Sequence, residues 1–372
     1  MQIDFFMNRG IYMKLKVDRL REAVQIFDSI PSFATYDNMM REPTNNFYVH
    51  SGDKNKIFFI DVLSYLELLT EIGSDESALE FYKKIKNREI NASANDNQQY
   101  VFGDESITFK HVERGWGDEP EWVISEEKKI PEIILIREYT PQHFYENDLV
   151  WITEAHFNLN WARRLNKLGL EEEAQKTLKA IKSSKLMRED GFLNCSYRFK
   201  RSHGIQSFYE VYSRANVDYT NTMIELGHLE EARDMIKRIM QSNLYQENGL
   251  LKNSAVLDEK GREEKPLSST NFYWAATLYK AGFKTEAIEV ISETKKRSVA
   301  ITEKLDKLES MTLIRCLITI GLEEKAEELI ESIRKKELLY EKQTDYTKPL
   351  NLKSNDIELY SNWTMALLGI GI

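Results

Sequence analysis

The sequence predicts an all-α protein that folds as one closed ring of six helical hairpins. Three observations predict this fold. A short glycine-to-alanine unit occurs five times, the helices before and after it differ in their apolar pattern, and the two ends of the chain carry complementary halves of one more hairpin. We expect the ring to take in residues 1–372 as a single domain.

The repeated unit places a glycine five residues before an alanine. A glycine just past an apolar helix, followed by polar or acidic residues and a new amphipathic run, is typical of a helix C-cap, a tight turn and a helix N-terminus. Each unit is therefore expected to be the tip of a helical hairpin. The pairs are Gly73 with Ala78, Gly169 with Ala174, Gly227 with Ala232, Gly282 with Ala287, and Gly321 with Ala326.

The helices on the two sides of each turn are predicted to form two layers. After the alanine, apolar residues share one helical face, as Met235, Ile236 and Ile239 do, while the other face is charged. The segments before the turns, such as NFYWAATLYKA and MTLIRCLITI, are apolar nearly all round. This pattern is expected of helices that are buried on both sides. The sequence thus predicts an inner layer before the turns and an outer layer after them.

The first and last helices each provide half of a hairpin. VDRLREAVQIFDSI has the outer pattern, with Ala23 followed by Ile26, Phe27 and Ile30, and NDIELYSNWTMALLGIGI is an inner helix that reaches Gly369. A ring lets the two halves pair, whereas a linear solenoid exposes both apolar faces. A solenoid of helix pairs would also repeat regularly, near about 34 residues. Here the alanines from Ala23 through Ala326 are separated in turn by 55, 96, 58, 55 and 39 residues, which is too irregular for a solenoid.

The longest connection, residues 90–147, has apolar and β-branched runs between Gly, Asp and Pro residues. Such runs are typical of strands, so we expect a small β-rich insertion around residues 95–140. It belongs to the end of the ring that is built from long loops. A lid over the mouth, a cover for the end of the ring and a subunit contact are the open interpretations.

Polar residues near the starts of the inner helices are the candidates for chemistry, because functional groups concentrate on long loops and the helix ends that they join. Two opposed carboxylates supply the acid and base, or the acid and nucleophile, of glycoside cleavage. Helix capping is the competing interpretation of each single carboxylate. The candidate catalytic residues are Asp218, Glu309, Glu154 and Asp61, with Asp218 and Glu309 preferred. The candidate substrate-binding residues are His156, Trp151, Tyr219, Asn271, Trp274, Arg214, His203 and Trp363.

Two loops before inner helices begin alike, with a glycine turn and an apolar pair in EDGFLNCSYRFK and ENGLLKNSAV. The first loop goes on to concentrate basic and tyrosine side chains, from Tyr197 and Arg198 to His203 and Arg214. Such a cluster can bind an anionic group such as a uronate, sulfate or phosphate. A solvated basic loop on an acidic protein is the alternative.

With these hairpins the sequence resembles the six-hairpin α/α toroid superfamily, which includes glycosidases, sugar epimerases, unsaturated glucuronyl hydrolases and the related terpenoid cyclases and prenyltransferases. The resemblance covers nearly the whole chain and rests on its hairpins, not on a catalytic motif of one family, and a fold alone does not define a function. It implies an (α/α)6 toroid and favours a carbohydrate-active enzyme, first of all a glycoside hydrolase.

Two other functions stay open, and a third is disfavoured. The disfavoured one is a sugar epimerase, which would use an inner histidine such as His156 to move the proton, because a single histidine is better explained by a structural role. A terpenoid cyclase or prenyltransferase relative predicts a deep cavity lined by Phe, Tyr and Trp with few paired charges, although no DxDD or DDxxD motif occurs. A non-catalytic helical-repeat scaffold predicts a filled or shallow mouth, and the modest counts of 16 Gly and 6 Trp favour it.

Composition limits the partners. The chain is 42% hydrophobic and 30% charged, as expected of a soluble globular protein, and its net charge of −9 argues against a broad nucleic-acid surface. No apolar stretch approaches the roughly 20 residues that span a bilayer, so we expect a cytoplasmic protein without a membrane partner. Cys195 and Cys316 form no zinc motif, and no nucleotide-binding glycine motif occurs, so neither metal nor cofactor is expected. The expected ligand is a small molecule or an oligosaccharide, and the oligomeric state is left open.

Overall fold

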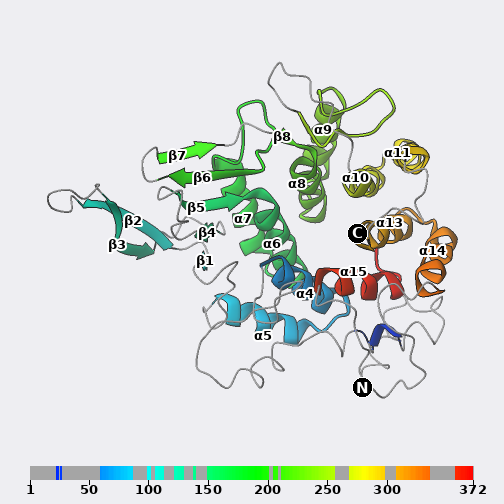
Figure 1. The fold of residues 1–372 in the computed structure, drawn as a ribbon, viewed down its shortest axis with the longest axis horizontal. Coiled ribbons are helices and arrows are strands. Elements are labelled where there is room, and N and C mark those ends of the chain that lie inside the picture. The colour runs from blue at the N-terminus through cyan, green and yellow to red at the C-terminus, as the bar shows by residue number, and fades with distance from the viewer. Residues whose placement is uncertain are drawn as a thin grey trace.

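The computed structural model of the chain is mostly helical, and its helices follow one another in pairs (Figure 1). The structure describes residues 22–24, 26, 59–86, 99–101, 105–112, 121–129, 137–139, 149–200, 204–207, 211–255, 268–297, 307–335 and 357–371. Among the helices in these ranges, none is long and apolar enough to cross a bilayer.

The inner layer consists of the helices that precede the glycine turns. These are α4 (Phe59–Glu71), α6 (Ala155–Lys167), α8 (Ser213–Glu225), α10 (Ser268–Ala281), α13 (Lys307–Thr319) and α15 (Ile357–Leu367). Each packs against the next in chain order, and α15 packs against α4. The contacts therefore run in a cycle around a common centre, as Figure 1 shows. A linear solenoid has no contact between its first and last inner helices.

The outer helices follow the turns and pack against their inner partners. They are α5 (Asp75–Lys86), α7 (Glu171–Ser183), α9 (Leu229–Met240), α11 (Lys284–Arg297) and α14 (Glu323–Lys335). On α9 the buried residues are Ala232, Met235, Ile236 and Ile239, the face that the apolar spacing predicts. The amphipathic pattern of this layer is confirmed.

The turns between the layers have the predicted cap. Gly169 has φ +76°, the left-handed conformation that costs a glycine least, and the Leu170 N–H returns to the Leu165 carbonyl at 2.9 Å. The glycines of the other turns also have positive φ. Five residues on, the alanine is buried in each hairpin, at Ala78, Ala174, Ala232, Ala287 and Ala326. A small side chain is needed there because the two layers of helices meet at this point.

The inner helices are less apolar than the sequence suggests. Glu67 on α4, Arg163 and Arg164 on α6 and Arg315 on α13 are all largely buried. Their side chains face the centre of the ring, where the Glu67 carboxylate binds Arg164 and Arg315. The expectation of helices that are apolar nearly all round is therefore wrong for the side that faces the centre.

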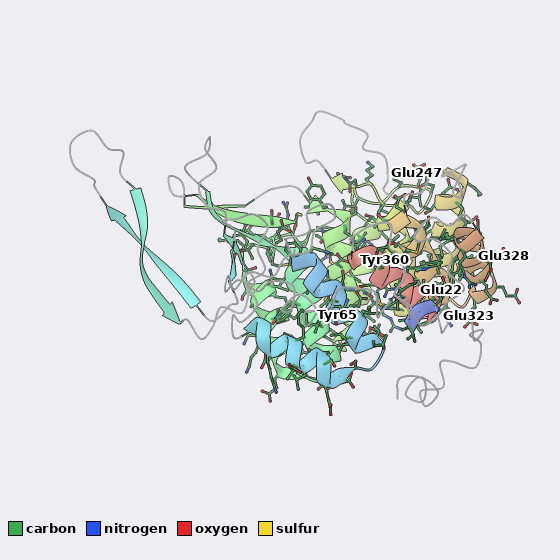
Figure 2. All side chains as sticks on the ribbon, turned by 60° about the horizontal axis from the view of Figure 1, so that its bottom comes forward. Glu22, Tyr65, Glu247, Glu323, Glu328 and Tyr360 are labelled. Carbon is green, nitrogen blue, oxygen red and sulfur yellow. The ribbon has the colours of Figure 1, made fainter. Side chains whose placement is uncertain are left out.

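Strands occupy the long connection before α6. β1 (Gln99–Val101), β2 (Glu105–Val112), β3 (Glu121–Lys129) and β4 (Arg137–Tyr139) lie within residues 95–140, so the β-rich segment is confirmed. β2 and β3 pair only with each other and stand away from the helices (Figures 1 and 2). The remaining strands are β5 (Leu149–Glu154), β6 (Ser196–Lys200), β7 (Gly204–Ser207), β8 (Val211–Tyr212) and β9 (Ser254–Ala255).

One antiparallel sheet has the order β1-β4-β5-β6-β7, and β8 pairs with β9. β5 leads without a loop into α6, so the sheet lies at the N-terminal end of that helix.

The described part of the N-terminal segment lies beside α15 (Figures 1 and 2). Ala23 and Ile26 are 1% and 0% exposed, and the Glu22 carboxylate forms an ion pair with Arg334 of α14 at 2.7 Å. Phe27 and Ile30, which share the predicted apolar face, lie outside the described residues.

Candidate functional site

A cavity of about 300 Å³ lies at the centre of the ring, and all six inner helices line it. Six cationic side chains contribute to its wall: Arg163, Arg164, Lys167, Arg214, Lys280 and Arg315. Three carboxylates join them: Glu67, Glu71 and Glu225. Tyr273 is the one Phe, Tyr or Trp among these lining residues. The wall is thus charged, unlike the aromatic wall with few paired charges that a terpenoid cyclase predicts.

One group of side chains forms around Asp218, which is buried in α8. His156 Nδ1 lies 2.8 Å from Asp218 Oδ2, and Arg214 Nε donates to both carboxylate oxygens at 3.2 and 3.1 Å. Arg214 and Asp218 are four residues apart on one helix, a spacing that puts them on one face. The guanidinium carbon of Arg214 lies 3.5 Å from the ring centre of Tyr273, at the distance of a cation–π contact.

The contact with Asp218 fixes how His156 can act. A carboxylate only accepts hydrogen bonds, so Nδ1 carries the proton and Nε2 is the nitrogen that accepts one. Asn160 Nδ2 lies 3.2 and 3.1 Å from the two ring nitrogens and is a second polar neighbour of the imidazole. With Nδ1 held by Asp218, Nε2 is the ring nitrogen that can accept a proton, and His156 lines the cavity.

Two carboxyl groups near His156 have pKa values shifted in opposite directions. Burial raises the pKa of Glu154, against the attraction of His156. Burial acts in the same sense on Asp218, but Arg214, His156 and Arg163 outweigh it and hold the pKa of that carboxyl well below its usual range. Glu154 is thus the better proton donor, and Asp218 is a permanent anion.

Glu67 organises the other end of the cavity. Its carboxylate binds Arg164 at 2.8 Å and Arg315 at 3.0 Å. Arg315 also donates to Asn362 Oδ1 at 2.6 Å and to the Gly371 carbonyl at 2.8 Å. Burial would raise the pKa of Glu67, but the arginines outweigh it and lower the pKa to about 2.

The other two lining carboxylates are also paired. Glu225 Oε1 lies 3.1 Å from Lys280 Nζ, and Glu71 Oε1 lies 3.0 Å from Lys167 Nζ. Burial opposes the ionisation of Glu225, but Lys280 and the arginines of α6 lower its pKa to about 2. Glu67 and Glu225 are therefore ionised counterions and not proton donors.

The structure brings three predicted site residues together: His156, Arg214 and Asp218. Glu154 ends β5 and precedes the first residue of α6, two residues before His156. Glu309 lies in the first turn of α13 and is not among the residues that line the cavity. Asp218 is not among these lining residues either, and the pairing of Asp218 with Glu309 stays a prediction.

Other predicted site residues make contacts that stabilise the fold. Asn271 binds the backbone of Leu251, as its Oδ1 accepts from the N–H at 2.8 Å and its Nδ2 donates to the carbonyl at 3.2 Å. Tyr219, Trp274 and Trp363 are buried in the hydrophobic core. The side chains of Asp61 and Trp151, and all of His203, lie outside the described residues.

Sequence reasoning missed the charged residues that line the cavity. They are Glu67, Glu71, Arg163, Arg164, Lys167, Glu225, Lys280 and Arg315. For Arg315 the signal in the sequence is a lone charge inside an apolar run, MTLIRCLITI. In the described residues, no group of three or more His, Cys, Asp and Glu side chains is arranged to hold a metal ion.

Comparison with protein-family models finds no match, and comparison with curated protein sequences finds none. Solved structures match nearly the whole chain. A D-mannose isomerase has a TM-score of 0.53 and 7% identity, covering 94% of this chain and 95% of that chain. An α-amylase from Clostridium perfringens has a TM-score of 0.53 and 11% identity, with coverage of 94% and 97%.

An inactive variant of an α-1,6-mannanase from Salegentibacter sp. HEL1_6, in complex with α-1,6-mannotriose, has a TM-score of 0.52 and 9% identity, with coverage of 94% and 97%. Together these neighbours show that the chain has a helical fold of the α/α toroid type, like that of glycosidases and sugar isomerases.

Proposed function

We propose that this chain is a carbohydrate-active enzyme and that the central cavity binds its sugar substrate. The observation that carries the proposal is the His156 imidazole, which Asp218 orients at the wall of a polar cavity. An oriented imidazole in a closed polar site is a common proton-transfer group. The fold supports a sugar substrate, because its neighbours include an isomerase of D-mannose and an α-1,6-mannanase in complex with mannotriose.

The chemistry that these residues favour is a proton transfer beside a carbonyl. His156 Nε2 takes the proton from carbon 2 of an open-chain aldose, and the carbon–hydrogen electron pair forms an enediolate. Arg214 stabilises the negative oxygen, since its guanidinium lies at the cavity wall beside Tyr273. Return of the proton to carbon 1, with the hydroxyl proton of oxygen 2 passing to oxygen 1, gives the ketose, while protonation of carbon 2 on its other face gives the epimer. No oxidant or reductant is needed.

Glycoside hydrolysis is the second candidate, and the opposite pKa shifts of Glu154 and Asp218 favour it. A glycosidase uses one protonated and one ionised carboxyl group, and separated pKa values identify such a pair. Glu154 would protonate the leaving oxygen, and Asp218 would act as the ionised partner. Glu309 and Asp61 remain alternative partners for Glu154.

One NMR experiment separates the two reactions. The protein is incubated in D2O with a panel of reducing sugars and oligosaccharides. Deuterium incorporation next to the carbonyl, lost in His156→Gln by a factor of about 10²–10⁴, supports proton transfer. Release of new reducing ends, lost in Glu154→Gln, supports hydrolysis. A wild-type protein that does neither across the panel contradicts the proposal.

Matched controls lie on outer elements of the ring. His228→Gln is the control for His156→Gln, because His228 lies in the turn before α9. Glu172→Gln is the control for Glu154→Gln, because Glu172 is 92% exposed on α7. Both controls should keep wild-type rates.

We further propose that the N-terminal helix completes the sixth hairpin of an (α/α)6 toroid with α15, within a single domain that carries residues 90–147 as an insertion. The burial of Ala23 and Ile26 and the ion pair of Glu22 with Arg334 support this pairing. That the insertion acts as a lid stays a prediction.

A further inference from the structure

Arg163 is a buried cation without a counterion. Its side chain lines the cavity, the residue is 5% exposed, and no carboxylate of the described residues forms an ion pair with it. Its hydrogen-bond partner is the Asn160 side-chain oxygen, and its Nε is buried without a partner. An unpaired buried charge destabilises a protein, so a buried cation is normally matched by an anion.

The carboxylates around Arg163 are already bound to other cations. Glu67 is held by Arg164 and Arg315, and Glu225 is held by Lys280. Arg163 helps to lower the pKa of both carboxyl groups, so it lies within electrostatic reach of each. These pairs occupy the carboxylates and leave Arg163 as the unmatched charge at the centre of the ring.

The whole cavity has an excess of positive charge. Six cations and three carboxylates line it, and the buried Asp218 behind Arg214 reduces the formal excess to two. The excess also acts on Lys280. Burial lowers the pKa of Lys280, the positive charges of Arg163 and Lys167 lower it further, and Glu225 opposes this shift. An anion that entered the cavity would relieve this repulsion and supply the partner that Arg163 lacks.

The position of Arg163 relative to His156 suits a small anionic sugar. Arg163 and His156 contact the same Asn160 side chain, Arg163 at its amide oxygen and His156 at its amide nitrogen, so the guanidinium and the imidazole lie about one amide group apart. A monosaccharide whose reacting carbon lies at His156 therefore reaches Arg163 with another of its groups. The cavity volume of about 300 Å³ is at the small end of ligand pockets, as a monosaccharide requires.

We propose that the substrate is an anionic sugar whose terminal carboxylate or phosphate binds Arg163 while the reacting carbon lies at His156. The proposal rests on the proposed function for the sugar and on Arg163 alone for the anion. A carboxylate and a phosphate ester share this chemistry, since both accept two parallel hydrogen bonds from a guanidinium.

Calorimetric titration tests the proposal with four probes: glucose, glucuronate, glucose 6-phosphate and inorganic phosphate. An anionic sugar should bind the wild-type protein roughly 10- to 100-fold more tightly than glucose, the range expected for charge-assisted hydrogen bonds. Arg163→Gln should remove this preference, so that the variant binds glucose and the anionic sugars with similar affinities, while Arg163→Lys should retain part of the preference. Comparison of glucuronate with glucose 6-phosphate identifies the anionic group.

A second measurement excludes a merely structural role for Arg163. Urea unfolding of the ligand-free protein should show Arg163→Gln to be as stable as wild type or more stable, because an unpaired buried charge is lost. Arg233→Gln is the control, since Arg233 lies on α9 and pairs with Glu230 at the surface. It should keep the binding preference.

Equal affinities for glucose and both anionic sugars, or a preference that survives in Arg163→Gln, would overturn the proposal. Binding of inorganic phosphate that depends on Arg163, with no binding of any sugar, would contradict the proposed function and retain the anion site. A protein that binds none of the four probes contradicts both.

Discussion

Glu67 holds three inner helices together through one carboxylate, since it binds Arg164 of α6 and Arg315 of α13 from its position on α4. Glu67→Gln leaves both guanidinium groups with a missing charge partner inside the ring. We expect this to lower the free energy of unfolding by about 3–5 kcal/mol at pH 7. Urea unfolding followed by circular dichroism measures it.

The same residue gives a pH dependence with a defined sign. The pKa of Glu67 is about 2 in the folded protein and roughly 4.3 in an unfolded chain. Its contribution is therefore fully present above about pH 4.3 and is lost as the pH falls towards 2. The stability difference between wild type and Glu67→Gln should shrink in that window. A stability difference that stays constant from pH 7 to pH 3 would contradict this role of Glu67. Glu172→Gln is the control, because Glu172 is exposed.

At the scale of elements, two loops that begin alike in the sequence are pinned in the same way. Asn216 Oδ1 accepts from the Leu193 N–H at 2.8 Å, and Asn216 Nδ2 donates to the Leu193 carbonyl at 3.1 Å. Asn271 makes the same two contacts with Leu251. Each asparagine thus fastens the loop that follows an outer helix to the start of the next inner helix.

Asn216→Ala should therefore destabilise the protein by about 2–4 kcal/mol, because two buried backbone groups of Leu193 lose their partners. Hydrogen exchange should rise first in residues 186–194, since that loop loses its attachment to α8. Asn243→Ala is the control, because Asn243 is exposed in the loop after α9. Equal stability of the two variants would show that Asn216 does not pin the loop.

The elements also show what the sequence can predict. The turn at Gly169 and Ala174 depends on a short stretch of sequence. A left-handed glycine and a buried alanine define it within six residues, and the structure has this turn. The centre of the ring does not depend on one short stretch. Arg315 and Glu67 are 248 residues apart, so no spacing along the chain indicates that they meet. The sequence predicts Asp218 near the start of an inner helix, which makes it a candidate, although it is the sixth residue of α8, whereas Arg163 carries no such signal.

At the scale of the whole molecule, the contacts among inner helices return from α15 to α4, so the ends of the chain matter to every hairpin. The glycine units predict the separate hairpins, and the two unpaired halves at the ends predict the closure. The shape and charge of the cavity follow only once all six inner helices are in place, because each contributes to its wall. Sequence patterns therefore give the ring more readily than the site.

Closure of the ring through the N-terminal helix predicts that a substitution at Ile26 destabilises neighbouring helices of the ring as well as the N-terminal helix. Ile26→Ala removes a fully buried side chain and should cost about 2–5 kcal/mol, with faster hydrogen exchange in α14 and α15 as well as in the N-terminal helix. Ile288→Ala is the matched control, because Ile288 is 53% exposed on α11 and its truncation should cost little. A ring that is closed by other contacts would confine the exchange to the N-terminal segment and leave α15 as protected as in the wild-type protein.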